Sequence, residues 1–226
     1  MLHALGRALL ELVYPPRCAA CGDAVAAEPF CPVCGEAVDP APPGCPRCGL
    51  PGAAALCPAC HAAPPAFDAV RSGGLFGGPL ADAIHALKYG DRPALARPLG
   101  AWLARVAPPP PGAAIVAVPL ARRRRIERGY DQAQLLADAL ARAAGAPRLR
   151  GALRRVRETP PQVGRTRAER ARNVAGAFAA IAPLAGRDLV LVDDVVTTGA
   201  TADAAARAAK EGGARSVVVV ALARAE

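Results

Sequence analysis

The sequence predicts an α/β protein in which a mainly parallel sheet with flanking helices follows a small cysteine-rich module. Two observations carry this prediction. All eight cysteines lie between positions 18 and 60, and from position 66 onward aliphatic runs alternate with segments of helical periodicity. The chain has 226 residues, 53% of them hydrophobic, enough for one α/β core and a small module besides. We therefore expect two domains, the cysteine module over 1–65 and the sheet domain over 66–226.

The chain begins with a predicted amphipathic helix over residues 1–14, in which five apolar residues recur at helical spacing. Arg7 and Glu11 interrupt this apolar face and no cleavage-type site follows, so we do not interpret the segment as a signal peptide. No run approaches the roughly 20 apolar residues that span a membrane. We therefore expect no membrane span and a cytoplasmic location.

The cysteines form four Cys-x-x-Cys pairs, a spacing that lets two thiolates of one tight turn reach the same tetrahedral metal. Short gaps favour two sequential zinc ribbons, with a cross-braced pairing left open. The expected ligand sets are Cys18, Cys21, Cys31 and Cys34, then Cys45, Cys48, Cys57 and Cys60. A segment of about 45 residues without a core needs such a metal, because structural zinc supplies about 10–16 kcal/mol of folding energy at neutral pH.

The cysteines could serve two other purposes. A disulfide framework needs an oxidising compartment, which this sequence does not indicate. The string CPACH over 57–61 matches a c-type haem attachment pattern, but that reading leaves three pairs unexplained. His61 is a possible substitute ligand that a full set of eight thiolates makes unnecessary. The sequence therefore predicts two structural zinc ions.

In the sheet domain, strand and helix patterns alternate up to a long charged segment. The glycines of SGGLFGG, 72–78, fit neither of the two common phosphate-loop patterns and are interpreted as hairpin glycines. The prolines at 108–111 form a connector, and a loop carries RRRRIERGYD. The expected elements are short strands over 67–76, helices over 79–89 and 94–107, a strand over 113–118, a helix over 132–144 ended by Gly145, and a strand near 148–154.

The segment over 157–173 is long and basic for a connector, so we expect a mobile functional loop. A closing βαβ unit follows, with a strand over 188–193, a loop over 194–200, a helix over 201–211 and a strand over 216–222.

The string LVLVDDVVTTGAT, 189–201, carries the main functional signal. Asp193 and Asp194 follow a buried strand, so at least one carboxylate must project above the sheet, where it can accept hydrogen bonds from a vicinal diol. The residues Thr197, Thr198, Gly199, Ala200 and Thr201 then supply hydroxyls and backbone N–H groups at a helix N-terminus. A ribose followed by its 5′-phosphate fits this order. The alternative is that the aspartates only form a turn and cap the helix.

The net charge of +9 is concentrated in one segment. Residues 121–175 carry fifteen basic and five acidic side chains, whereas residues 1–65 carry three and five. A positive field of this kind attracts phosphate-bearing ligands, and charge alone does not choose between a small phosphate and nucleic acid.

The string over 189–201 resembles the phosphoribosyl pyrophosphate (PRPP) motif of type I phosphoribosyltransferases. Further motifs extend the resemblance over most of the chain to the ComF family of phosphoribosyltransferase-like competence proteins. These motifs are LVYPPRCAACG (12–22), ALKYGDRPALARPL (86–99), RRRRIERGYDQAQLLADAL (122–140) and TPPQVGRTRAERARNVAGAF (159–178). The chain departs from the family at Tyr130-Asp131, where Phe-Asn is common, and at Arg165, where Leu is common. These departures concern local contacts and leave the resemblance intact.

The resemblance implies a type I phosphoribosyltransferase-like sheet and roles for further residues. It assigns pyrophosphate binding to the loop of Pro119, Leu120, Ala121 and Arg122, and makes Arg165 and Arg170 of the mobile loop candidate phosphate contacts or catalytic groups. Arg123, Arg124 and Arg125 are either further contacts or a solvated run. His85 and Lys88 lie one helical turn apart on a face near the hood, where they either have a role in the site or form a solvated face, the interpretation that we favour.

Two functions follow as hypotheses. In the first, Mg²⁺ and PRPP bind, and a phosphoribosyl group is transferred to an acceptor that the sequence does not identify, so catalysis itself stays open. In the second, the protein is an accessory of DNA uptake that binds single-stranded DNA through its basic segment over 121–175. The resemblance also implies the DNA-uptake machinery as an expected partner.

Overall fold

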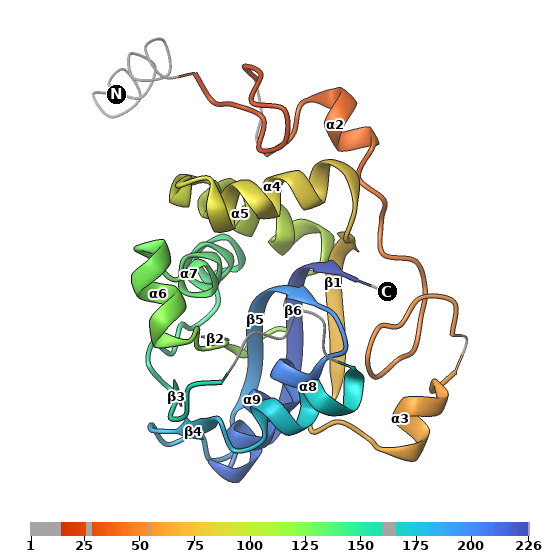
Figure 1. The fold of residues 1–226 in the computed structure, drawn as a ribbon, viewed down its shortest axis with the longest axis vertical. Coiled ribbons are helices and arrows are strands. Elements are labelled where there is room, and N and C mark those ends of the chain that lie inside the picture. The colour runs from red at the N-terminus through yellow and green to blue at the C-terminus, as the bar shows by residue number, and fades with distance from the viewer. Residues whose placement is uncertain (1–14, 26–28, 54, 160–165, 226) are drawn as a thin grey trace.

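The sheet domain is built on four parallel strands in the order β1-β6-β5-β2 (Figure 1). The computed structural model describes residues 15–25, 29–53, 55–159 and 166–225, so the helix expected over 1–14 lies outside the described residues. The strands are β1 (Ala69–Leu75), β2 (Ala114–Ala117), β5 (Asp188–Val196) and β6 (Ser216–Arg224). The predicted parallel α/β sheet is confirmed.

Helices cover both faces of the sheet, which explains why its strands read as continuous aliphatic runs. Alternate residues of β5 enter different clusters: Leu189 and Leu191 pack with α9, and Val190 and Val192 pack with the opposite layer. That layer holds α4 (Gly78–Tyr89), α5 (Ala96–Val106) and α7 (Gln132–Ala144), whereas α8 (Arg167–Val174) and α9 (Ala200–Glu211) lie on the other side (Figure 1). The turn η1 (Pro93–Leu95) leads into α5.

The hairpin expected over 72–78 is absent from the described residues, because this stretch forms one strand, β1, that leads directly into α4. The glycines serve close packing instead. A Cβ at Gly73 would lie 2.4 Å from the ring of Trp102, and one at Gly74 would lie 2.5 Å from the carbonyl oxygen of Asp39. The same ring of Trp102 meets Phe30 of the cysteine module edge-on, with centroids 5.8 Å apart.

Two further expectations of a loop are wrong. Arg122–Arg128 forms a helix, α6, that ends at Gly129, and Arg167–Val174 forms α8 within the segment over 157–173. Thr166 and Glu169 begin α8 with a reciprocal capping box, a signal that the sequence contains. Residues 160–165 lie outside the described part of the chain. Arg157 joins the two ends of the segment by donating to the carbonyl oxygens of Asn173 (3.0 Å) and Ala175 (2.6 Å).

The strand expected near 148–154 is shorter than expected and does not join the main sheet. β3 (Leu153–Arg155) pairs antiparallel with β4 (Phe178–Ala180), so the two form a separate small sheet. Only a single parallel bridge, between Ile115 and Arg148, joins this region to the main sheet within the described residues. The helix over 132–144 and its end at Gly145 are confirmed.

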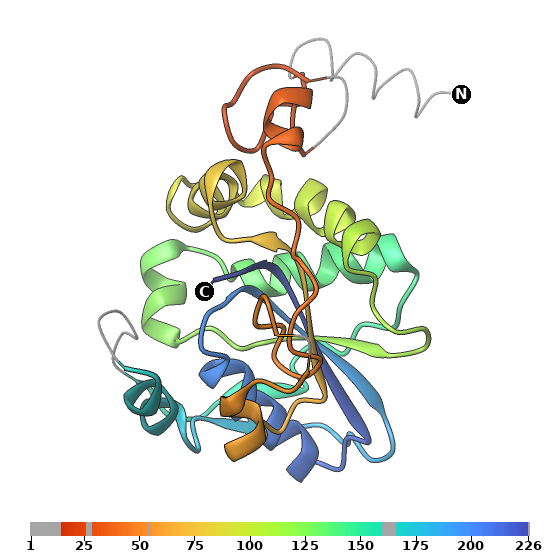
Figure 2. The ribbon, with the colours of Figure 1, turned by 90° about the vertical axis from the view of Figure 1, so that its right-hand side faces the viewer.

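The two halves of the cysteine module lie at different ends of the molecule. α2 (Pro32–Glu36), which follows Cys31, lies beyond α4 and α5, whereas α3 (Pro58–Ala62), which follows Cys57, lies at the opposite end of the sheet (Figures 1 and 2). Cys45, Cys48, Cys57 and Cys60 are all buried in the same hydrophobic cluster as Phe67 and α9. The second half is therefore part of the core of the sheet domain, although the expected boundary at residue 65 separates it in sequence.

Candidate functional site

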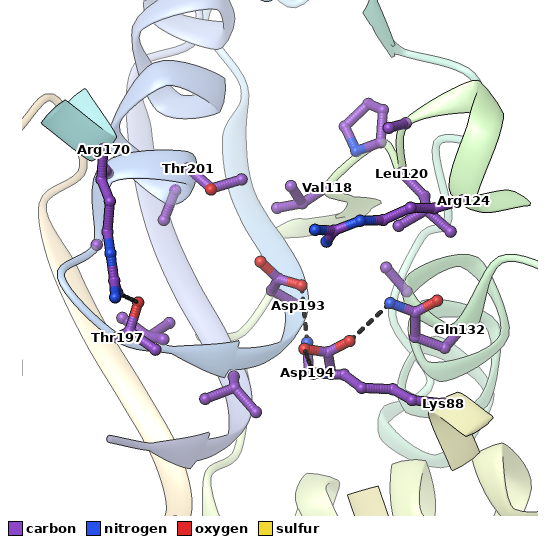
Figure 3. A pocket seen from close by; sticks show the side chains of 18 of the residues that line it. Lys88, Val118, Leu120, Arg124, Gln132, Arg170, Asp193, Asp194, Thr197 and Thr201 are labelled. Carbon is purple, nitrogen blue, oxygen red and sulfur yellow. Dashed lines mark hydrogen bonds and ion pairs between the residues drawn. The ribbon is translucent and has the colours of Figure 1, made fainter. Parts of the chain in front are cut away.

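A cavity of about 370 Å³ lies at the carboxyl ends of β2 and β5, where parallel α/β sheets hold their ligands (Figure 3). Every residue from Asp193 to Thr201 lines it. The opposite wall comes from the loop after β2 and from α4, α6 and α7. The candidate ligand residues of the string over 189–201 therefore share one cavity.

Asp193 and Asp194 lie inside β5 rather than after it, because β6 runs far enough to pair β5 as far as Val196. Successive side chains of a strand point to opposite faces, so the two carboxylates have different surroundings. Asp193 is half-buried in the cavity, whereas Asp194 is only 5% exposed and turns toward the layer of α4 and α7. The N–H of Asp194 donates to Oδ1 of Asp193 (2.9 Å).

Lys88 and Gln132 hold the carboxylate of Asp194 from two helices (Figure 3). Nζ of Lys88 lies 2.7 Å from Oδ1, and Nε2 of Gln132 donates to Oδ2 at 2.7 Å. A buried carboxylate is stable only when it is paired and hydrogen-bonded, and this pair of contacts meets both needs. These two contacts fix the orientation of the Asp194 side chain near the end of β5.

The interpretation of Lys88 as part of a solvated face is wrong, although His85 is exposed as expected. Helical spacing places Lys88 on the buried face of α4, because it follows Ile84 by four positions along the apolar stripe of Leu80, Ile84 and Leu87. Sequence reasoning also missed Gln132, a polar residue at the start of the buried stripe of α7. Polar residues on an apolar stripe are the signal that identifies both.

The surroundings of Asp193 disfavour its charge. Burial raises the pKa of its carboxyl group to about 7, with a further rise from the neighbouring Asp194 carboxylate, against the opposing effects of the Asp194 N–H and of Lys88. In the cavity without a ligand, this carboxylate therefore takes up a proton near neutral pH, and a ligand that donates hydrogen bonds or brings a cation would favour its ionised form.

Residues Thr197 to Thr201 form a tight turn into α9. Gly199 precedes the helix with φ of 79°, a left-handed conformation that other residues rarely adopt, and the N–H of Ala200 donates to Oγ1 of Thr198 at 3.4 Å. Arg170 of α8 lines the cavity and donates to Oγ1 of Thr197 at 3.1 Å (Figure 3). The turn thus combines hydroxyls, backbone donors and a helix N-terminus, which together suit a phosphate.

The arginines of α6 divide between the cavity and the solvent. Arg124 and Arg128 line the cavity together with Pro119, Leu120 and Ala121 of the predicted loop. Arg123 is exposed and pairs with Glu127 at 2.7 Å. Arg122 is exposed beside the cavity, and its backbone N–H donates to Oε1 of Glu158 at 2.8 Å. Helical spacing of four explains why Arg124 and Arg128 share a face. Arg165 lies outside the described residues.

Within the described part of the chain, three polar atoms of cavity residues are buried without a hydrogen-bond partner: Nη1 of Arg128, Nε of Arg155 and Oε1 of Gln132. Since buried polar groups are nearly always paired, these atoms mark a place for a polar ligand. Two of the three belong to guanidinium groups, so the cavity favours an anion.

Aromatic rings gather at one side of the cavity. Phe76 and Tyr89 both line it, and Tyr89 is 73% exposed. His85 lies between the two rings, with centroids 5.8 Å from Phe76 and 6.2 Å from Tyr89, and the guanidinium carbon of Arg128 lies 5.1 Å from the Tyr89 centroid. In a chain with 4% aromatic residues, this grouping indicates a surface for a flat ligand.

The eight cysteines form the two sequential sets that were expected, so the cross-braced alternative is excluded. Within each set the four Sγ atoms lie within 4.8 Å of one another. A tetrahedron with Zn–S bonds of about 2.3 Å requires S···S distances of about 3.8 Å, and Cys21–Cys31 (3.9 Å) and Cys48–Cys57 (3.7 Å) match it. Both sets therefore fit zinc held by four thiolates. Their surroundings differ, because the second set is fully buried and Cys21 of the first is exposed.

We expect the purified protein to carry two equivalents of zinc, since the thiolates divide into two complete sets. Metal analysis after purification without added zinc checks this number, and replacing Cys34 by Ser should remove one equivalent. A single equivalent in the unaltered protein would contradict two independent sites.

Comparisons with known proteins agree with this architecture. Residues 9–62 match the family described as the double zinc ribbon domain. The chain is 36% identical over 204 residues to the DNA utilization protein YhgH of Salmonella typhi, which covers 86% of this chain and 90% of that protein. The corresponding protein of Escherichia coli K12 is 34% identical over the same shares.

Two further matches cover less of the chain. Competence protein F of Haemophilus influenzae is 36% identical over 115 residues, half of each chain. The solved structure of glutamine phosphoribosylpyrophosphate amidotransferase from B. subtilis, complexed with ADP and GMP, is 21% identical over 62% of this chain and 27% of that one, with a TM-score of 0.39. Among the residues that the structure describes, none forms a helix long and apolar enough to cross a membrane.

Proposed function

We propose that this protein binds Mg²⁺–PRPP or a related phosphoribosyl ligand and acts in the handling of DNA. The premise is its family: the chain belongs to the ComF family, which includes the DNA utilization proteins YhgH and competence protein F. The observation that carries this proposal is the shared cavity: a carboxylate, a phosphate-type turn and several guanidinium groups face one space. The zinc thiolates favour a reducing compartment, so we propose a cytoplasmic location.

The ligand would lie with its 5′-phosphate on the turn from Thr197 to Thr201 and its ribose hydroxyls on Asp193. The pyrophosphate would then face the loop over 119–121, where Arg124 and Arg128 line the cavity. Mg²⁺, where bound, would neutralise phosphate charge and favour the ionised form of Asp193. Asp194 is held by Lys88 and Gln132, so we assign it a positioning role in place of the direct ribose contact expected from the sequence.

Transfer of the phosphoribosyl group is the reaction that such a site would support. Departure of pyrophosphate from C1 leaves an oxocarbenium-like centre, and the cations at α6 and Arg155 would stabilise the leaving charge. The aromatic surface of Phe76 and Tyr89 offers a place for the acceptor, whose identity we leave unassigned. The proposal therefore names the donor and the leaving group.

Single-stranded DNA binding is the second candidate, and the aromatic surface favours it. Exposed Tyr89 with Arg128 beside its ring is the kind of pair on which bases stack, and the basic segment over 121–175 continues from it. The names of the relatives support a link to DNA. Both functions can use the same protein, because the phosphate turn and the aromatic rings come from different segments of the chain, the turn before α9 and the region of α4.

Calorimetry at two salt concentrations separates the two candidates. We expect Mg²⁺–PRPP to bind with an affinity that changes modestly between about 50 and about 200 mM salt, since its contacts are enclosed, whereas binding through a DNA backbone weakens steeply over this range. A screen of bases and amines for pyrophosphate release then tests turnover. Binding of single-stranded DNA without binding of PRPP would contradict the first candidate.

A further inference from the structure

We infer that Arg224 couples the second cysteine set to the phosphate turn, so that this set positions the ligand site while the first set does not. The inference rests on the proposed function, because it concerns the turn over 197–201 as a phosphate site. Arg224 is the last residue of β6 and only 4% exposed, after a run of aliphatic residues from Val217 to Ala223. A buried guanidinium at that place must be satisfied by donating to nearby acceptors.

The guanidinium of Arg224 donates to backbone carbonyls of both regions. Nε donates to the carbonyl oxygen of Cys48 (3.2 Å), a residue of the second cysteine set. Nη1 donates to the carbonyl oxygens of Val196 (3.1 Å) and Thr197, which open the phosphate turn. One side chain therefore joins the backbone of a metal-ligand residue to the backbone of the ligand site.

The contacts to Val196 and Thr197 fix the direction of neighbouring N–H groups. In a trans peptide, the carbonyl oxygen and the following N–H point to opposite sides of the chain. Holding the carbonyls of Val196 and Thr197 against Arg224 therefore sets the N–H groups of Thr197 and Thr198 on the other side. Both threonines line the cavity.

The segment that follows the second set makes two further contacts with this region. The backbone N–H of Ala66 donates to Oδ1 of Asp203 in the first turn of α9 (2.6 Å). The ring of Phe67 lies 3.5 Å from the position that a Cβ on Gly199 would occupy.

The first cysteine set is placed differently. Its neighbour Phe30 contacts Trp102 of α5, and α2 lies beyond α4 and α5, at the other end of the molecule. The two sets are therefore alike in chemistry and different in what they support. This difference supplies an internal control.

The experiment compares Arg224→Met and Arg224→Lys with Arg215→Met, which removes an exposed arginine near the other end of β6. Calorimetry measures the binding of ribose 5-phosphate and of inorganic pyrophosphate. We expect Arg224→Met to weaken ribose 5-phosphate by about 10- to 100-fold, the effect of losing hydrogen bonds to a charged group, and to leave pyrophosphate within about twofold. Arg224→Lys should recover part of the loss, and Arg215→Met should match the unaltered protein.

A second arm uses the cysteines and keeps the test valid if Arg224→Met fails to fold. Cys60→Ser and Cys34→Ser should each lose one zinc equivalent by metal analysis, and only Cys60→Ser should lose affinity for ribose 5-phosphate. Equal effects of the two cysteine variants, or unchanged binding by folded Arg224→Met, would overturn the coupling. Absence of binding by the unaltered chain would overturn the proposed function, and the inference with it.

Discussion

Replacement of Asp193 by Asn should weaken the binding of Mg²⁺–PRPP by at least about 100-fold, because two ribose hydroxyls lose an ionised acceptor. The fold should survive, since the carboxylate lies in the cavity and Asn retains an oxygen for the N–H of Asp194. The matched control is Asp188→Asn, which alters an exposed ion pair at the opposite end of the same strand. Calorimetry on both variants gives the comparison.

The pKa of Asp193 adds a pH dependence with a defined sign. Because burial and Asp194 raise this pKa to about 7, the carboxyl group is protonated at pH 6 and the affinity for Mg²⁺–PRPP should fall as the pH drops below about 7. The pKa of this carboxyl group is near 4 in the unfolded chain and about 7 in the folded chain. Between these two pH values the unfolded chain has already lost the proton that the folded chain keeps, so the free energy of unfolding falls as the pH rises through this range. Asp193→Asn should therefore unfold at a higher urea concentration than the unaltered protein at pH 8.

Two results would count against the assignment of Asp193. Unchanged affinity in folded Asp193→Asn would remove the ribose contact from this residue. An affinity that is flat from pH 6 to pH 8 would show that its ionisation does not matter to the ligand. The double variant Asp193→Asn/Asp194→Asn should lose binding as completely as the single variant, because we propose that Asp194 acts only by positioning β5.

Replacement of Lys88 by Met should lower the free energy of unfolding by about 3–5 kcal/mol, because it leaves the carboxylate of Asp194 buried without its cation. The side chains of Lys88 and Asp194 are 18% and 7% exposed, so solvent screens the pair weakly. Urea unfolding at pH 8 measures the change. The remaining contact from Gln132 does not replace a charge.

The chain supplies its own control for this experiment, since Lys210 is the other lysine. Lys210 pairs with Asp68 at 2.9 Å, but both side chains are more exposed, so Lys210→Met should cost less than about 1 kcal/mol. Adding Asp194→Asn to Lys88→Met should recover much of the lost stability, because the uncompensated charge is removed. Equal losses in the free energy of unfolding for the two lysine replacements would show that the buried Lys88–Asp194 pair contributes no more to stability than the more exposed Lys210–Asp68 pair.

Two parts of the molecule could be predicted from the sequence alone. The string over 189–201 was informative because buried aliphatics, aspartates and a glycine turn follow one another in contiguous order, and the structure places all its polar members at one cavity. The cysteine sets were equally readable, because ligand spacing within a turn is a local property. Both predictions needed only short-range information.

The parts that sequence reasoning missed depend on contacts between distant segments. Gly73 resembles a hairpin residue until the ring of Trp102 is placed against it. Lys88 and Gln132 contact Asp194 across separations of 106 and 62 residues in the sequence, and no local sequence pattern predicts these contacts. Sequence reasoning misses the α6 and α8 helices because a high density of arginine is also typical of exposed loops, although the capping box at Thr166 is a local signal for α8.

The packing of Trp102 against Phe30 also makes the protein its own spectroscopic probe. Trp102 is the single tryptophan of the chain, and it lies where the first cysteine half meets α5. Its fluorescence should therefore change when that half detaches, while events at the second half and at the phosphate turn leave it largely unaltered. Emission spectra can thus follow one end of the molecule without any attached label.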